Sequence, residues 1–198
     1  APVRIVWQQD SSQITGANHL LVPGNGQSDL ANNRLCVLKS TPTEHPALLL
    51  DFGKELQGGL QLVTGMPPSH DPVSVRVRFG ESVSEAMCEI DGANGASNDH
   101  AMRDFVVSLP WLGVQEIGNS GFRFVRIDVL GDSTELQLKE VRAISTFRDI
   151  PYLGSFRCND ERLNRIWKTG AYTVHLNMQE YLWDGVKRDR LVWVGDLH

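Results

Sequence analysis

The chain contains 198 residues, of which 41% are apolar and 22% are charged, and its formal net charge is −5. This composition is typical of a globular protein with one large domain, or with one domain and part of another. The acidic balance and the lack of a strong basic cluster argue against a nucleic-acid partner, and apolar runs such as residues 47–50 are far too short for a membrane helix of roughly 20 residues.

Residues 1–150 are expected to form short β-strands separated by turns. The β-favouring residues gather in six segments: 48–52, 59–63, 73–79, 105–109, 122–130 and 136–144. In the third segment Val73, Val75 and Val77 alternate with polar residues, which is the period-2 pattern of a half-buried strand. Clusters of Pro, Gly and Asn separate the segments, and no helical pattern lies between them. The sequence therefore predicts a mainly β domain, an antiparallel β-sandwich of jelly-roll type.

Two features of the sequence bear on metal binding. The loop over residues 91–99 is rich in Asp, Asn and Gly, but it lacks the alternating ligand positions and final Glu of an EF-hand. A surface loop is the favoured interpretation. Cys36, Cys88 and Cys158 are far apart and show no Cys-x-x-Cys spacing. The sequence thus predicts no metal and no other cofactor.

The periodicity changes after Pro151. Asn159 is expected to cap a helix over about residues 160–180, with Asp160 and Glu161 near its positive dipole end. Apolar side chains then recur at helical spacing: Leu163, Ile166, Trp167, Val174, Met178 and Tyr181. Such a stripe needs partner helices, and no further helix is evident in the sequence. We therefore expect the chain to be part of a larger protein.

The last segment, residues 184–196, is the richest in chemically active groups. Its acidic and basic residues are interleaved with Leu191, Val192, Trp193 and Val194. A solvated surface run would be polar throughout, so this mixture suits a half-buried pocket wall. From the residues alone, an ion-pair network beside a core indole is the favoured alternative. A segment so dense in functional groups seldom stands at a natural terminus, which again predicts a truncated chain.

Five segments, in this order along the chain, resemble bacterial α-L-rhamnosidases of glycoside hydrolase family 78. Residues 51–58, 80–82 and 121–126 are similar to the sandwich strands of that family, residues 154–167 to the entry of its first barrel helix, and residues 184–196 to its charged motif. The resemblance implies a β-sandwich accessory domain over residues 1–150. It also implies that residues 151–198 form a linker and the first helix of a truncated (α/α)6 catalytic barrel.

The resemblance also implies a reaction and the residues that perform it. Asp189 stands where the family's general acid, usually Glu, is found. Asp184 and Arg188 would contact rhamnose hydroxyls, Trp193 would pack against the sugar, and Asp196 would bond a hydroxyl or orient its neighbours. The implied reaction is inverting hydrolysis of a terminal α-L-rhamnosyl bond, which uses an acid and a base about 6.5–9.5 Å apart. The family's base lies in a later part of the barrel, so this chain alone is expected to be inactive.

Two other functions remain open from the sequence. One is a non-catalytic carbohydrate-binding sandwich, and the other is an accessory domain of a barrel glycosidase with a different sugar specificity. The expected partner is a rhamnose-containing glycan or glycoside, and homo-oligomerisation is left open. The N-terminus shows no charged segment followed by an apolar core. The compartment is therefore left open between the cytoplasm and, if an export signal was removed, the periplasm or the exterior.

Overall fold

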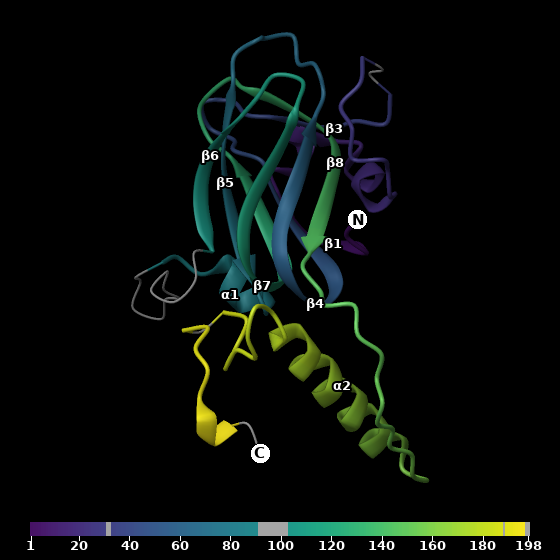
Figure 1. The fold of residues 1–198 in the computed structure, drawn as a ribbon. Coiled ribbons are helices and arrows are strands. Elements are labelled where there is room, and N and C mark those ends of the chain that lie inside the picture. Colours follow the sequence, from purple (N-terminus) through teal and green to yellow (C-terminus); the bar gives the residue numbers. More distant parts are fainter. Residues whose placement is uncertain (31–32, 91–102, 188, 197–198) are drawn as a thin grey trace.

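A computed structural model describes residues 1–30, 33–90, 103–187 and 189–196, with the side chain of Asp196 left out (Figure 1). The strands are β1 (Arg4–Gln9), β2 (Ile14–Thr15), β3 (Cys36–Lys39), β4 (Ala47–Thr64), β5 (Val73–Gly80), β6 (Asp104–Leu109), β7 (Val114–Val129) and β8 (Glu135–Ser145). The α-helices are α1 (Val83–Met87) and α2 (Glu161–Asn177), and short 3-10 helices span Ser11–Gln13, Ala17–Leu21 and Val194–Asp196. The loop over residues 91–99, favoured above as a surface loop, lies outside the described residues.

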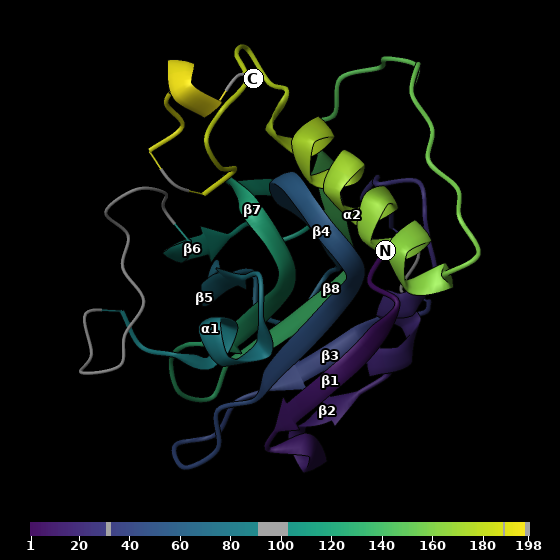
Figure 2. The ribbon, with the colours of Figure 1, turned by 90° about the horizontal axis from the view of Figure 1, so that it is seen from below.

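The strands form an antiparallel sheet in the order β2-β3-β8-β4-β7-β5-β6, with β1 paired to β4. The long strands β4 and β7 pair along most of their length, and the far half of β4 also pairs with β8. Figure 2 shows the sheet curving, with β5 and β6 on one side and β1, β2 and β3 on the other. This arrangement confirms the predicted antiparallel sandwich followed by a linker and a helix.

The core lies inside the curved sheet. Its fully buried side chains come from strands that lie far apart in the sequence, and they include Leu48, Leu50, Leu60, Leu62, Val75, Val77, Phe79, Phe122 and Ile127. The valines that alternate along β5 all point into this core, as the period-2 pattern predicts. Each buried Val, Leu or Phe contributes about 1.5–3 kcal/mol relative to full exposure. None of the residues of this core comes from the segment after β8.

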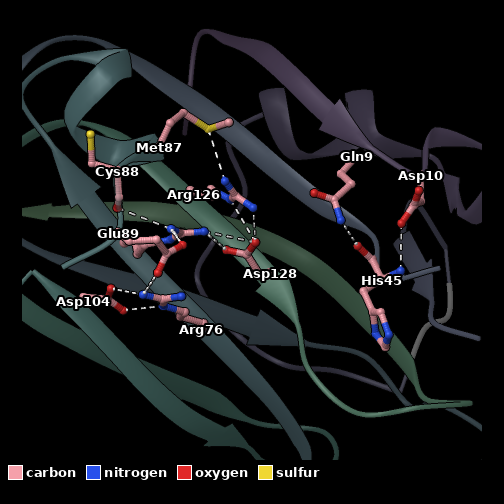
Figure 3. Close-up of polar contacts among 11 residues, drawn as sticks. Gln9, Asp10, His45, Arg76, Met87, Cys88, Glu89, Asp104, Arg126 and Asp128 are labelled. Atoms are coloured by element: carbon pink, nitrogen blue, oxygen red, sulfur yellow. Dashed lines mark hydrogen bonds and ion pairs between the residues drawn. The ribbon is translucent and has the colours of Figure 1, made fainter. Parts of the chain in front are cut away.

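Charged residues on β5, β6 and β7 form an ion-pair network outside this core (Figure 3). Arg76 binds Asp104 through two hydrogen bonds of 2.8 and 2.6 Å and also reaches Glu89 at 2.8 Å. The buried Arg78 binds Glu89 at 2.9 Å and Asp128 at 3.2 Å. These contacts link neighbouring strands, so this cluster of charges is accounted for by the fold itself.

Asp51 is a buried carboxylate at the point where β4 bends. It is 1% exposed and accepts hydrogen bonds from Arg123 at 2.8 and 3.0 Å, from Arg4 at 2.9 Å and from the backbone N–H of Gly53 at 2.7 Å. Gly53 has a φ of +85°, which favours glycine. The hydrogen bonds of Arg123 hold the pKa of Asp51 at about 2. Asp51 therefore joins β1 and β7 to the bend in β4.

Asp51→Asn is expected to destabilise the chain by about 2 kcal/mol at pH 7, because the pKa of this carboxyl lies about two units below its ordinary value. Because the pKa of Asp51 is lower in the folded state, its carboxylate stabilises the folded state at every pH above the ordinary pKa of 3.8. This stabilisation is lost as the pH falls from 3.8 towards 2. Urea unfolding at pH 7 and pH 3 measures both effects. Asp71→Asn, at an exposed loop position, is the control. Equal stability of the Asp51→Asn variant and the wild type at pH 7 would contradict the assignment.

Helix α2 begins one residue later than expected. Asp160, not Asn159, is the N-cap, because its side chain accepts hydrogen bonds from the backbone N–H groups of Arg162 and Leu163 at 2.7 and 3.4 Å. Glu161 then lies in the first turn, where its negative charge interacts favourably with the positive end of the helix dipole. The prediction of Asn159 as the cap was wrong because both residues can cap a helix and their order alone does not decide between them.

Candidate active site

The segment that follows α2 lies against one end of the sandwich, beside the end of β7 (Figures 1 and 2), and its Lys187 reaches Glu85 of α1. Val186 is 7% exposed and packs on Gly121 of β7. The contact is close, because a Cβ atom added to Gly121 would lie only 2.2 Å from Cγ2 of Val186. The hydroxyl of Tyr172 in α2 donates a 2.6 Å hydrogen bond to the backbone carbonyl of Glu55. The helix and the segment after it are therefore both attached to the sandwich.

The loop over residues 184–193 is closed by Asp184. The backbone N–H of Asp184 donates to the carbonyl of Leu191 at 2.9 Å, and the backbone N–H of Leu191 donates back to Asp184 Oδ1 at 3.1 Å. The indole N–H of Trp193 donates to Asp184 Oδ2 at 3.3 Å. Each carboxylate oxygen of Asp184 thus has a partner within the loop, and the side chain organises the loop.

The structure brings three of the five predicted site residues into this loop. Asp184 and Trp193 are in direct contact, and the half-buried Asp189 lies between them in the chain. Trp193 is 54% exposed, so the alternative of a core indole does not fit the described residues. Arg188 and the side chain of Asp196 lie outside the described residues. The individual roles of all five residues stay predictions.

Arg190 turns the loop just after Asp189. It has a left-handed φ of +56°, a conformation that costs energy for a residue with a side chain. Its guanidinium donates to the carbonyl of Asn119 in β7 at 2.5 Å and to the carbonyl of Val186 at 3.1 Å, and it lies 4.9 Å over the ring of Trp183. These contacts hold the turn against the sandwich.

A cluster of carboxylates faces this loop from the sandwich. Lys187 Nζ lies 2.8 Å from Glu81 and 2.5 Å from Glu85 of the α1 region. Glu55 Oε1 is buried and has no hydrogen-bond partner among the described residues. Burial, and then repulsion from Glu81, raise the pKa of Glu55 to about 8, although Lys187 lowers it in part. Two carboxylates thus bind one ammonium group at the junction, and the charge of that ammonium group also acts on a third carboxyl, Glu55.

Sequence reasoning missed the four residues of this cluster. Glu55 and Glu81 lie within segments that carry the family resemblance, but no sequence spacing shows that Glu81 and Glu85 bind Lys187 or that the charge of Lys187 acts on Glu55. The only available signal was a Ser-x-x-Glu pattern at residues 82–85, which marks a helix start.

An apolar groove of 320 Å³ runs between the linker and α2. It is lined in part by Pro151, Tyr152, Trp167 and Val174. His175 is buried at its edge and bonds Tyr152 Oη at 3.0 Å and the carbonyl of Arg148 at 2.6 Å. Trp167 therefore lines a groove and is only half-buried in this chain, although apolar residues at helical spacing usually pack in a core. Tyr181 continues the same helical spacing but is exposed in this chain, because α2 ends at Asn177 and Tyr181 lies in the segment after it.

Two classes of site find no support in the described part of the chain. No group of three or more His, Cys, Asp or Glu side chains there is arranged to hold a metal ion. No helix there has the length and apolar character that crossing a membrane requires.

Known proteins match both parts of the chain. Residues 151–198 match a family model described as the bacterial alpha-L-rhamnosidase 6 hairpin glycosidase domain. A curated alpha-L-rhamnosidase from Formosa agariphila is 31% identical over 78 residues, which are 39% of this chain and 8% of that protein.

Two solved structures have the same fold, each with a TM-score of 0.67 and 21% identity. One is a rhamnosidase from Klebsiella oxytoca with rhamnose bound, aligned over 80% of this chain and 32% of its own. The other is a GH78 family rhamnosidase from Bacillus sp. GL1, aligned over 91% of this chain and 17% of its own. The chain thus spans no more than 32% of any of these three relatives.

Proposed function

We propose that this chain belongs to an α-L-rhamnosidase of glycoside hydrolase family 78, an enzyme that hydrolyses terminal α-L-rhamnosyl bonds with inversion. Its similarity to three rhamnosidases and to a rhamnosidase family model supports this proposal. The observation that carries the proposal is the match of residues 151–198 to the six-hairpin glycosidase domain, together with the closed loop that these residues form at the sandwich. The substrate is a rhamnose-containing glycoside. Rhamnose bound to the Klebsiella oxytoca relative supports this choice of sugar.

Within this proposal Asp189 is the general acid that protonates the departing glycosidic oxygen. Trp193 offers an exposed indole face for the apolar side of the sugar ring, and Asp184 holds that indole in place through the 3.3 Å hydrogen bond. Asp184 and Arg188 contact hydroxyl groups of the rhamnose, and Asp196 bonds a hydroxyl group or orients its neighbours. The base that activates water belongs to a later part of the barrel, so the chain alone is expected to be inactive.

A protein extended through a complete barrel is expected to release rhamnose from an aryl α-L-rhamnoside, whereas the 198-residue chain is expected to release none. Proton NMR during the reaction should show β-rhamnose first, because a single displacement inverts the anomeric centre. An aryl β-galactoside serves as the control substrate. First appearance of α-rhamnose, or equal turnover by the 198-residue chain alone, would overturn the proposed mechanism.

A further inference from the structure

Lys187 connects the proposed catalytic loop to the sandwich. It precedes Asp189 by two residues, and its ammonium group reaches Glu81 Oε2 at 2.8 Å and Glu85 Oε1 at 2.5 Å. These carboxylates flank the start of α1, more than one hundred residues earlier in the chain. The pair is partly shielded from water, since the Lys187 and Glu85 side chains are 23% and 17% exposed. Such pairs are screened less by salt than fully exposed ones.

The acceptors on α1 are fixed by their own hydrogen bonds. Ser82 caps the helix by accepting from the backbone N–H of Glu85 at 3.2 Å. Glu85 Oε2 accepts from the backbone N–H of Glu81 at 2.8 Å, and Glu85 Oε1 also binds Arg103 at 2.8 Å. The carboxylate of Glu85 is therefore oriented by the sandwich itself, and Lys187 binds to an acceptor that is already in place.

A second anchor lies on the other side of Asp189. Arg190 donates to the carbonyl of Asn119 in β7 at 2.5 Å, and its left-handed backbone is held in that state. Val186, just before Lys187, is buried against Gly121. Asp189 thus lies between two anchors that both attach to the sandwich.

We propose that Lys187, held by Glu81 and Glu85, is a positioning residue through which the sandwich sets the place of the Asp189 carboxyl. This role rests on the proposed function. Asp is one methylene shorter than the Glu usual at this position in the family, so its reach depends more on where its backbone lies. Proton transfer needs heavy atoms about 2.6–3.2 Å apart, and a displacement of about 1 Å can cost on the order of 100-fold in rate.

A merely structural ion pair would behave differently from a positioning residue. Loss of a structural pair lowers stability and affects every substrate alike. Loss of correct placement of a general acid harms only those substrates whose leaving group needs a proton. The dependence of rate on the leaving group therefore separates the two roles.

The experiment compares Lys187→Met, Lys187→Arg and Lys39→Met in the enzyme with its complete barrel. Lys39 pairs with Glu135 at 3.1 Å on a different part of the sandwich and is the matched control. The substrates are an alkyl α-L-rhamnoside, which needs protonation, and a 2,4-dinitrophenyl α-L-rhamnoside, which does not. Lys187→Met is expected to lower kcat/KM about 10- to 100-fold for the alkyl substrate and less than about 3-fold for the dinitrophenyl substrate.

The other variants fix the interpretation. Lys187→Arg should keep the alkyl rate within about 3-fold of the wild type, because a cation remains between the two carboxylates. Glu81→Gln, at a more exposed position, should show the same preference for the dinitrophenyl substrate, with a smaller loss of kcat/KM on the alkyl substrate. This variant tests the proposal even if Lys187→Met folds poorly. Lys39→Met should change neither rate by more than about 2-fold.

Three results would overturn the positioning role. Equal losses on both substrates for Lys187→Met and Glu81→Gln would make the contact structural only. An Asp189→Asn variant in the same series tests the proposed function separately. If Asp189→Asn discriminates between the substrates and the Lys187 variants do not, only the positioning role is wrong. If Asp189→Asn keeps the full alkyl rate, the proposed acid is wrong and the role of Lys187 falls with it.

Discussion

Asp189→Asn is expected to lower kcat/KM of the complete enzyme about 10²- to 10⁴-fold for rhamnosides with a poor leaving group. The amide cannot donate the proton that the departing oxygen needs, although it keeps nearly the size and shape of the carboxyl group. Binding of rhamnose itself should change little, because the indole of Trp193 and its hydrogen bond to Asp184 stay in place. Steady-state kinetics together with titration of rhamnose measure the two effects separately.

Two further variants control this result. Asp189→Glu restores the acid usual in the family and should retain activity, although the carboxyl then reaches about one methylene further. Asp149→Asn, at an exposed position in the linker, should leave kcat/KM unchanged within about 2-fold. If Asp189→Asn kept more than half of the wild-type rate on an alkyl rhamnoside, another group would be the acid.

The strands of the core were predictable because their patterns are strong. The alternation of valines in β5 corresponds to burial in the structure. Residues 48–52 and 59–63, expected as two strands, are parts of the single strand β4, which continues through irregular pairing between Asp51 and Leu56. A sequence shows the polar residues at such an irregularity, but it does not show that neighbouring strands keep pairing on both sides of it.

The short strands β1 and β3 were missed for a related reason. Each is stabilised by a longer partner strand, β4 for β1 and β8 for β3. Residues 4–9 contain Ile5, Val6 and Trp7, which favour a strand, but the run is short, ends in two glutamines and shows no alternation of polar and apolar residues. Tertiary pairing decides such segments, since β-propensity depends strongly on context.

In the predicted site, too, contacts between residues close in sequence could be anticipated, whereas contacts between distant residues could not. The contact of Asp184 with Trp193 joins residues nine apart, within a loop that the sequence had already marked as important. The contact of Lys187 with Glu85 joins residues 102 apart. Only the folded chain shows that sandwich carboxylates meet the proposed catalytic loop, because no spacing rule applies at that separation.

Glu55→Gln is expected to stabilise the 198-residue chain at pH 9 and to change its stability little at pH 4. The pKa of Glu55 is raised from 4.5 to about 8, chiefly by burial. Below pH 4.5 the carboxyl is protonated in both the folded and the unfolded state. As the pH rises through the window from 4.5 to 8, the unfolded state loses this proton first, so the wild type loses stability, on the order of 4 kcal/mol in total. Gln carries no charge in either state and avoids that loss.

Urea unfolding at pH 4, 7 and 9 measures the difference between the Glu55→Gln variant and the wild type, which should grow steadily with pH. Glu116→Gln is the control, since Glu116 is an exposed carboxylate on β7 and should change stability by less than about 0.5 kcal/mol at every pH. Lys187→Met in a chain that keeps Glu55 should increase the loss of stability with rising pH, because Lys187 is the cation that lowers the pKa of Glu55 most. A Glu55→Gln variant that is less stable than the wild type at pH 9 would show that the charged carboxylate is favourable at this junction, and that the buried Oε1 atom has a partner in solution.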